Sequence, residues 1–291
     1  MTEQSAPAIE ATVVVPAHNA ATTIGGQLDA LAIQNFVGTW EVVVVDDASD
    51  DGTADIVALW ADKLPSLTVV SLPVQVGESR ARNTGARAGR GRLIAYCDAD
   101  DLVSTQWLDG LVLALKENVL ATGPIDLSKL NPPLTYSWRR TRGWQELPRW
   151  LGYLVPIMAC TMGVRREAFE LAGGFDETMT VGADFDFAWR VQLAGGTVGY
   201  APDAVVHWRL RRGWSYFQRS IAYGAGDVEL YRRFRHRGLR RRPARGVLRV
   251  AGVVLTSPLL LLPSYRYGWM HLAGVELGRL KGSIASRTLF L

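Results

Sequence analysis

Cysteine is scarce in this 291-residue chain, which contains only Cys97 and Cys160. The two residues form no Cys-x-x-Cys pair and no metal-ligand spacing, and both lie in apolar runs. A free cysteine in such a run usually behaves as a small buried hydrophobe. Nothing therefore points to a disulfide framework, and the two thiols suit a reducing compartment.

Long apolar runs are also missing. The first ten residues are polar and acidic, without the basic and apolar regions of a cleaved signal peptide. The apolar run 250–262 has only 13 residues, whereas a transmembrane helix needs about 17–25. We therefore expect neither a signal peptide nor a clear membrane-spanning helix.

The overall composition is that of an ordinary globular protein, with 48% hydrophobic and 21% charged residues. A chain of this length buries enough apolar surface to fold without covalent staples. The net charge of +4 is modest, but most of the positive excess lies between Arg209 and Arg249. The Arg-, Ala- and Gly-rich usage is typical of a high-GC bacterium.

Short apolar runs alternate with helical patterns over the first hundred residues. The predicted strands are 12–16, 41–46, 67–71 and 93–97. The helices predicted between them are 22–33, 53–64 and 80–88. The first two runs are rich in valine and apolar throughout, as in strands covered on both faces. This alternation implies an α/β fold with a doubly wound, mainly parallel sheet.

The pattern becomes irregular at 120–150, a proline-containing stretch that resembles a long excursion of the chain more than a regular element. Its tryptophans either stack on a ligand or pack in the protein: Trp138, Trp144 and Trp150. Periodicity returns with predicted helices at 165–172 and 183–193, followed by predicted strands at 198–200 and 204–208.

Three polar clusters fall where predicted strands end, at 16–19, 46–51 and 98–101. In sheets of this kind ligands bind beyond the carboxyl ends of the strands. Capping of the following helices would explain one aspartate in each loop. It does not explain two aspartate clusters side by side in a protein of net positive charge, so we expect a functional rim.

Asp98 and Asp100 stand two apart at the end of a predicted strand and present carboxylates to the same small volume. Hard divalent cations with oxygen ligands are the usual means of neutralising a diphosphate. An Asp-x-Asp triplet alone is a weak signal, but its position after the strand 93–97 strengthens it.

Together these segments resemble the inverting family 2 glycosyltransferases, which have the GT-A fold with a Rossmann-like nucleotide-binding half. The segments that carry the resemblance are, in order, 13–19, 44–53, 77–85, 94–101, 173–177 and 184–190. They cover residues 12–210, and the ordered set is far more specific than any single member.

The resemblance implies roles for individual residues. It implies nucleotide-binding roles for Pro16, His18, Asn19, Asp47, Arg82 and Asp98. Asp100 would bind Mg²⁺ or Mn²⁺, His207 would contact the metal or the diphosphate, and Asp184 would be the general base. Further candidates are Arg80, which competes with Arg82, together with Asp186 and Trp208. Each histidine also has an interpretation without a function: His18 as a loop residue and His207 as a hydrogen-bonded core residue.

The base site departs from the family pattern. Members commonly carry Glu-Asp there, whereas this chain has Ala183 before Asp184, which puts the acceptor class in doubt more than the reaction type. Asp186 is a rival base, but residues two apart on a helix point away from each other. We favour Asp184; the alternative is that it only caps the helix.

A dense cationic stretch precedes the apolar run near the C-terminus. Its arginines are Arg232, Arg233, Arg235, Arg237, Arg240, Arg241, Arg242, Arg245 and Arg249. Basic residues beside the mostly apolar segment 247–262 fit a helix lying at the interface of an anionic membrane. A solvated basic face followed by a core helix is the alternative. The sequence shows no recognised nucleic-acid-binding module, so we expect no nucleic-acid partner.

We therefore expect a GT-A domain over 10–210 and a helical, membrane-facing extension over 211–291. The expected activity is inverting transfer from a UDP-, GDP- or dTDP-sugar to a hydroxyl of a lipid-linked or cell-surface glycan, with Mg²⁺ or Mn²⁺ as cofactor. The expected location is the cytoplasmic side, peripheral at the inner face of the cell membrane. The alternatives are a retaining transferase, a nucleotidyltransferase, or a degenerate nucleotide-sugar-binding scaffold.

Overall fold

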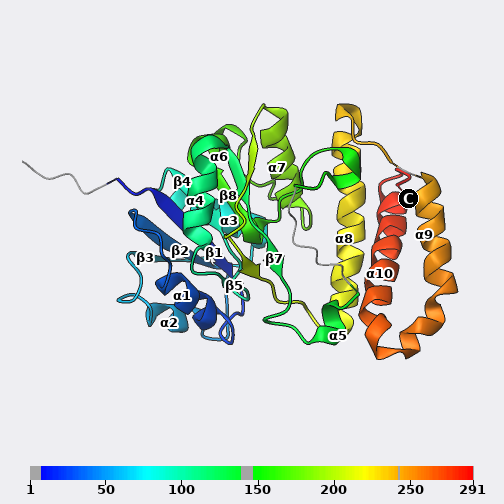
Figure 1. The fold of residues 1–291 in the computed structure, drawn as a ribbon, viewed down its shortest axis with the longest axis horizontal. Helices are drawn as coiled ribbons and strands as arrows, with labels where there is room; N and C mark the ends of the chain where they lie inside the picture. Colours follow the sequence, from blue (N-terminus) through cyan, green and yellow to red (C-terminus); the bar gives the residue numbers. More distant parts are fainter. Residues whose placement is uncertain (1–7, 139–146, 242, 291) are drawn as a thin grey trace, which may run out of the picture.

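The computed structural model of the protein describes residues 8–138, 147–241 and 243–290. Seven strands form its central sheet in the spatial order β3-β2-β1-β4-β8-β6-β9 (Figure 1). These strands are β1 (Ala11–Ala17), β2 (Trp40–Asp46), β3 (Leu67–Ser71), β4 (Leu93–Tyr96), β6 (Leu120–Thr122), β8 (Met162–Arg165) and β9 (Val198–Tyr200). The four N-terminal strands are parallel, and β8 runs antiparallel to both of its neighbours. The predicted α/β fold with a mainly parallel sheet is confirmed.

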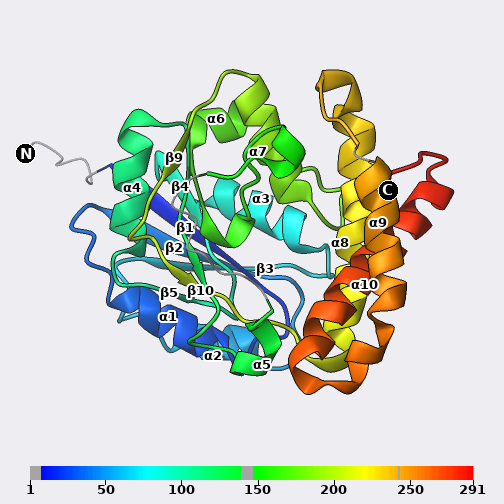
Figure 2. The same cartoon turned by 45° about the vertical axis from the view of Figure 1, so that its right-hand side comes forward.

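Both faces of the sheet are covered, because β1 and β2 are apolar on both sides. Val13 and Val15 pack in one core with helices α1 (Ile24–Ala32), α2 (Thr53–Ala58) and α4 (Trp107–Glu117). Val14 packs in the opposite core with α3 (Glu78–Ala88), α6 (Arg166–Leu171) and α7 (Ala183–Leu193). Figure 2 shows α1 and α2 on one side of the sheet and α3 and α7 on the other.

The strand register brings the predicted polar loops to one edge. Ala17 at the end of β1 lies opposite Asp46 at the end of β2, and Val14 lies opposite Tyr96 at the end of β4. Helix α3 lies close against this part of the sheet, since a methyl group on Gly85 would run into Val14. The loops that follow β1, β2 and β4 and the buried face of α3 therefore surround one region.

A small second sheet fixes the loop that follows β4. Its strands are, in spatial order, β5 (Leu102–Val103), β10 (Val206–His207) and β7 (Ile125–Asp126). The predicted strand 204–208 is thus confirmed only at residues 206 and 207. The stretch 120–150, predicted to lack regular elements, contains β6, β7 and the short helix α5 (Pro133–Tyr136). That prediction was wrong because strands of two or three residues are too short to show a period.

Three helices form the C-terminal part: α8 (Gly213–Phe234), α9 (Pro243–Leu255) and α10 (Pro263–Ala285). The helices α8 and α10 cross so closely that a side chain at Gly224 or Gly278 would meet the backbone of the other helix. Phe234 at the end of α8 packs into the same core as α7. Between α9 and α10 the chain forms a 3₁₀ turn, Ser257–Leu261, so the segment 247–262 is not one continuous helix. No helix among the described residues combines the length and the apolar character needed to cross a bilayer.

Candidate functional site

Arg82 on α3 faces the acidic loop that follows β4. Its Nη2 donates a hydrogen bond of 2.8 Å to Oδ1 of Asp98, and its side chain is buried. Although burial disfavours its charge, the nearby carboxylates of Asp98 and Glu78 raise the pKa of Arg82. The competing candidate Arg80 has a side chain that is 60% exposed and lies 3.7 Å from Glu177. Of the two arginines, Arg82 is the one next to the predicted site.

Carboxylates crowd together in the acidic loop. Potential ligand atoms of Asp98, Asp101 and Cys160 lie within 4.8 Å of one another. Asp101 is 1% exposed; its Oδ1 accepts a hydrogen bond of 2.8 Å from the backbone N–H of Arg209, and its Oδ2 has no partner among the described residues. Burial and the neighbouring carboxylates raise the pKa of Asp101. The pKa of Asp100 is also raised, by partial desolvation of its carboxylate in the loop and by the charge of Asp98.

These residues fit a divalent metal ion with oxygen ligands. Three carboxylates in one loop supply the hard oxygen donors that Mg²⁺ and Mn²⁺ prefer. A buried carboxylate oxygen without a partner is costly unless something pairs with it, and Oδ2 of Asp101 is such an atom. Cys160 offers a soft sulfur, which Mg²⁺ and Mn²⁺ do not prefer, and burial raises the pKa of its thiol.

His207 on β10 lies beside the acidic loop through the pairing of β10 with β5. Its Nδ1 is 2.7 Å from Oδ2 of Asp126. Burial raises the pKa of Asp126, but hydrogen bonds from Ser128 and His207 outweigh this effect and lower the pKa to about 2. A carboxylate on one ring nitrogen fixes the orientation of a histidine and leaves the other nitrogen for a ligand. The backbone N–H of Trp208 donates a hydrogen bond to the carbonyl oxygen of Asp126. The roles predicted for His207 and Trp208 stay predictions.

The loops after β1 and β2 are tied to each other. Nδ1 of His18 lies 2.7 Å from the carbonyl oxygen of Asp47, and the amide N–H of Asn19 donates to Oγ of Ser49. His18 and Asn19 are exposed at this edge, and Pro16 is partly exposed in an otherwise buried strand. These three candidates therefore border the same edge of the sheet as the acidic loop.

Asp47 is buried and uses both carboxylate oxygens within the protein. It accepts hydrogen bonds of 2.7 and 2.8 Å from the backbone N–H groups of Val76 and Gly77. Those residues lead directly into α3, which carries Arg82. The contacts of Asp47 thus position the loop before α3, and its predicted contact with a nucleotide base stays a prediction.

Asp184 lies in the first turn of α7. Its Oδ2 accepts a hydrogen bond of 3.2 Å from the N–H of Ala159, and its Oδ1 accepts one of 2.9 Å from the N–H of Phe185. Burial raises the pKa of Asp184, although the charge of Arg82 opposes the rise. A general base works best when its pKa lies close to the operating pH, and burial moves Asp184 in that direction.

Asp186, the rival base, has different partners. It is 2% exposed, accepts a hydrogen bond of 2.7 Å from Nε of Arg190, and lies 3.4 Å from Nη1 of Arg233. Its carboxylate is therefore occupied by cations that join α7 to α8. The contacts of the two aspartates agree with the expectation that they point in different directions.

The comparisons with known proteins decide the family. The family described as "Glycosyl transferase family 2" matches residues 12–172, and "Glycosyl transferase family group 2" matches residues 93–277. The first match covers more than half of the chain.

The chain belongs to glycosyl transferase family 2.

Several curated relatives are glycosyltransferases. Glycosyltransferase AglE of Haloferax volcanii is 25% identical over 75% of this chain and 73% of its own length. The succinoglycan biosynthesis protein ExoO of Rhizobium meliloti is 30% identical over 70% of this chain, and the pre-mycofactocin glycosyltransferase of Mycobacterium tuberculosis is 30% identical over 76%. The match spans only 62% and 47% of the length of those last two proteins.

Solved structures share the GT-A fold. The mannosyltransferase PcManGT from Pyrobaculum calidifontis, in complex with GDP-Man and Mn²⁺, has a TM-score of 0.68 at 22% identity and covers 94% of this chain and 86% of its own. Residues 1–349 of S. aureus TarS, in complex with UDP, have a TM-score of 0.58 at 17% identity and cover 96% and 92%. The chain is therefore a glycosyltransferase with the GT-A fold.

Asn83 is a residue of this family 2 glycosyltransferase that the sequence interpretation did not single out. Its side chain accepts from the N–H of Phe175 and donates to the carbonyl of the same residue, at 2.9 and 2.8 Å. Gly174 has a φ of +72°, and a side chain there would meet Oδ1 of Asn83. This pair fixes the turn before α7 relative to α3. Asn83 and Gly174 lie in two of the quoted motifs, but nothing in the sequence pairs those motifs with each other.

Asp101 is a second residue that the sequence interpretation did not single out. The interpretation also missed the arginines that face the acidic loop from the C-terminal segment. Nε of Arg209 donates a hydrogen bond of 2.8 Å to the carbonyl of Asp100. Arg211 acts electrostatically on Asp100, and Arg219 on α8 acts on Asp98. The signal in the sequence was the positive excess that begins at Arg209, of which the sequence interpretation assigned only the part from Arg232 onward to a membrane surface.

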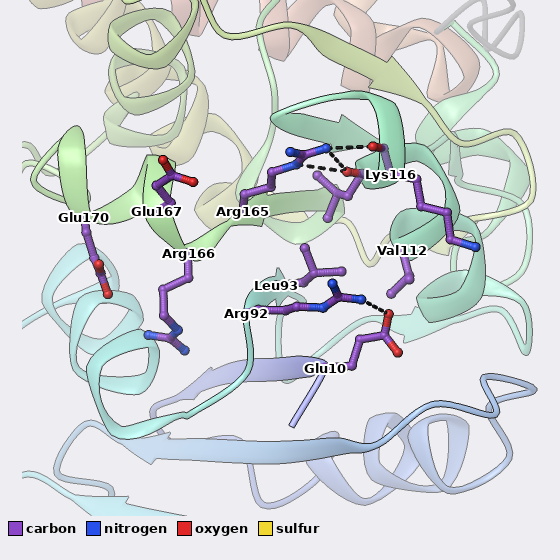
Figure 3. A pocket seen from close by; sticks show the side chains of 10 residues that line it. Glu10, Arg92, Leu93, Val112, Lys116, Arg165, Arg166, Glu167 and Glu170 are labelled. Carbon is purple, nitrogen blue, oxygen red and sulfur yellow. Dashed lines mark hydrogen bonds and ion pairs between the residues drawn. The ribbon is translucent and has the colours of Figure 1, made fainter. Parts of the chain in front are cut away.

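A pocket of about 590 Å³ lies at the opposite edge of the sheet (Figure 3). Glu10 before β1 and Leu93 at the start of β4 line it, so it is at the amino ends of these strands. Its wall includes Arg165, which donates to carbonyl groups at the end of α4, and Arg92, which pairs with Glu10 at 2.6 Å. None of the predicted site residues lines this pocket, whose lining residues lie away from the acidic loop.

Proposed function

We propose that this glycosyltransferase moves a sugar, with inversion, from a nucleoside diphosphate donor to an acceptor hydroxyl, and that Asp184 is the general base. The observation that carries this proposal is the position of Arg82. It contacts Asp98 in the acidic loop and acts electrostatically on Asp184 at the start of α7. Candidate donor-binding and base residues from separate motifs thus share one charged cluster.

Asp184 would accept the proton of the acceptor hydroxyl as the oxygen attacks the anomeric carbon. A positioned carboxylate contributes on the order of 10²–10⁴-fold to such a step. A single displacement from the side opposite the diphosphate inverts the configuration at that carbon. The backbone N–H of Ala159 and the first turn of α7 hold the carboxylate in place.

The acidic loop would hold Mg²⁺ or Mn²⁺ through Asp100, with Asp98 and Asp101 beside it. When bound, such an ion offsets the charge that develops on the leaving diphosphate. Asp98 is paired with Arg82 and would approach the ribose. The exposed His18 and Asn19 with Pro16 would border the base.

The ligands of the solved neighbours are GDP-Man with Mn²⁺ in one and UDP or UDP-GlcNAc in others. They support a UDP- or GDP-sugar as the donor, and a dTDP-sugar is the third candidate.

Donor hydrolysis in the absence of an acceptor tests this proposal. The protein is incubated with UDP-, GDP- and dTDP-sugars and Mn²⁺, and the products are followed by NMR before mutarotation. We expect release of a nucleoside diphosphate and a sugar of inverted configuration. Formation of a nucleoside triphosphate and a sugar 1-phosphate when pyrophosphate is added would indicate a nucleotidyltransferase, and a retained configuration would indicate a retaining transferase. Either result would overturn the proposal.

We also propose that the turn between α9 and α10 docks the enzyme on an anionic membrane. Large apolar side chains are exposed along this hairpin: Leu248, Val254, Leu255, Leu261, Leu262 and Tyr265. Exposed patches of this kind mark interaction surfaces. Arg266 beside the turn is also exposed, and so are Arg240 and Arg241, which lie before the other end of α9. Apolar side chains beside basic ones are the usual composition of an interfacial segment.

Not every arginine of the basic stretch is available to lipid. Arg232 and Arg233 pair with Glu229, and Arg249 pairs with Glu276 on α10 at 2.7 Å. Docking through the hairpin would place the enzyme at the inner face of the cell membrane and suits a lipid-linked or cell-surface glycan as acceptor. The printed name of ExoO, a succinoglycan biosynthesis protein, supports a glycan acceptor.

A further inference from the structure

Glu78, at the start of α3, lies between two arginines from different parts of the chain. Its Oε2 is 3.5 Å from Nη1 of Arg82, and its Oε1 is 3.6 Å from Nη2 of Arg219 on α8. A third arginine, Arg211, acts on it electrostatically. Two arginines, one from α3 and one from α8, therefore lie within 3.6 Å of one carboxylate, and a third acts on it from the segment before α8.

The contacts of Glu78 are loose for a structural ion pair. Charge-assisted pairs between arginine and carboxylate usually close to about 2.7–2.9 Å, as Arg82 does with Asp98. Glu78 lies at 3.5 Å or more from both arginines, and its side chain is 51% exposed. An exposed pair of this kind adds little to stability, so stability alone does not explain why arginines from α3 and α8 meet at this carboxylate.

The same arginines face the acidic loop. Arg82 contacts Asp98, Arg219 acts on Asp98, and Arg211 acts on Asp100. The carboxylates of Asp100 and Asp101 would balance the charge of a divalent ion, and Arg82 balances the charge of Asp98. The charge of a bound diphosphate would therefore need further protein cations, and Arg211 and Arg219 are cations at this place.

We propose that Arg219 binds the diphosphate of the donor, and that Glu78 occupies the position of a phosphate group while the donor is absent. This inference rests on the proposed function and extends it: the C-terminal segment supplies part of the donor site. Binding of the diphosphate exchanges the carboxylate of Glu78 for phosphate oxygens on the same guanidinium groups, and Glu78 turns to solvent.

The test separates recognition of the diphosphate from recognition of the base. The dissociation constants of UDP, GDP and dTDP, and of uridine, guanosine and thymidine, are measured by titration calorimetry with Mn²⁺ present. In Arg219→Ala we expect the preferred diphosphate to bind about tenfold more weakly or worse, because a charged hydrogen-bond partner is lost, while the nucleoside binds as in the wild type. Arg232→Ala is the matched control, since Arg232 is on the same helix, 45% exposed and paired with Glu229.

A second variant does not depend on removing an arginine. In Glu78→Gln we expect the diphosphate to bind roughly twofold to fivefold more tightly, because it no longer has to displace the carboxylate of Glu78 from the arginines. The gain is small because an exposed ion pair is weak. A purely structural role for Glu78 predicts equal or weaker binding.

The outcomes separate the two proposals. If the wild type binds a diphosphate, but Arg219→Ala matches Arg232→Ala or Glu78→Gln binds it no more tightly, this inference is wrong and the proposed function stands. If the folded wild type binds no diphosphate, both are wrong.

Discussion

The guanidinium group of Arg82 and the carboxylate of Asp98 meet at 2.8 Å across the edge of the sheet. Arg82 comes from the third helix, and Asp98 comes from the loop after the fourth strand. Because Arg82 also acts electrostatically on Asp184, it connects the proposed donor site with the proposed base. The predictions below test the members of this cluster and the elements that hold them.

Replacing Asp184 by asparagine should remove the base and leave the donor site intact. We expect kcat to fall about 10²–10⁴-fold, while the dissociation constant of the nucleoside diphosphate changes little. In the wild type, the acid limb of the pH–rate profile should lie above the ordinary aspartate range, because burial raises the pKa of Asp184. Near-normal transfer by Asp184→Asn would contradict the assignment.

Asp186→Asn is the matched variant on the same helix. Asp186 is buried against Arg190 and Arg233, so its loss should lower the free energy of unfolding by about 1.5–3 kcal/mol. Well below its melting temperature the variant should keep kcat within a small factor of the wild type. A large loss of kcat in folded Asp186→Asn, with normal kcat in Asp184→Asn, would exchange the two roles.

Arg82 and Arg80 should differ strongly in donor binding. Arg82→Gln leaves Asp98 without its partner, and we expect the nucleoside diphosphate to bind about tenfold more weakly or worse. Arg80→Gln removes an exposed pair to Glu177 worth about 0–1 kcal/mol, so affinity should hardly change. Equal effects of the two variants in calorimetric titrations would remove Arg82 from the site.

Asp176 should make stability depend on acid pH. Hydrogen bonds from Thr178 and Arg233 lower the pKa of Asp176 to about 2, from an ordinary value of 3.8. The difference corresponds to about 2 kcal/mol of folded-state stability. Because the folded pKa is the lower one, this stability is present above pH 4 and is lost as the pH falls toward 2.

Chemical denaturation of Asp176→Asn and the wild type measures this dependence. The wild type should be more stable at pH 6, and the difference should shrink as the pH falls through the interval between 4 and 2. A difference that stays constant down to pH 2 would show that the ionised carboxylate is not the stabilising species.

The membrane proposal depends on side chains that the fold does not need. Leu255 and Leu261 are 79% and 82% exposed, so replacing both by serine should leave the melting temperature nearly unchanged. We expect the double variant to lose most of its co-sedimentation with anionic phospholipid vesicles. The control is Leu171→Ser on α6, which is 83% exposed on another element. Equal loss in the control, or vesicle binding unaffected in the double variant, would contradict docking through the hairpin.

The sheet and its functional edge could be predicted from local patterns. Runs such as 41–46 are apolar on both faces, which requires cover on both sides, and parallel strands place their carboxyl ends at one edge. The strand β8 could not be predicted as the antiparallel neighbour of β4. Four residues, Met162–Arg165, carry no period that fixes their direction, and their position depends on contacts far along the chain.

The site could be predicted in part, because some of its residues also lie in local sequence patterns. Asp98 and Asp184 belong to recognisable motifs, and the structure brings both near Arg82. The part played by Arg219 could not be predicted. In the sequence it is one arginine among many, and only the crossing of α8 over the edge of the sheet brings it to Glu78.

Binding of a nucleoside diphosphate that depends on metal tests the central claim most directly. Thermal unfolding is measured with UDP, GDP, dTDP and CMP, each with and without Mn²⁺, in the wild type and in Asp100→Ala. A ligand that binds only the folded state adds about 2.7 kcal/mol at 100 times its dissociation constant. We predict that at least one diphosphate stabilises the wild type only with Mn²⁺ and does not stabilise Asp100→Ala. If no nucleotide stabilises the folded wild type under either condition, the account of this edge as a donor site is wrong.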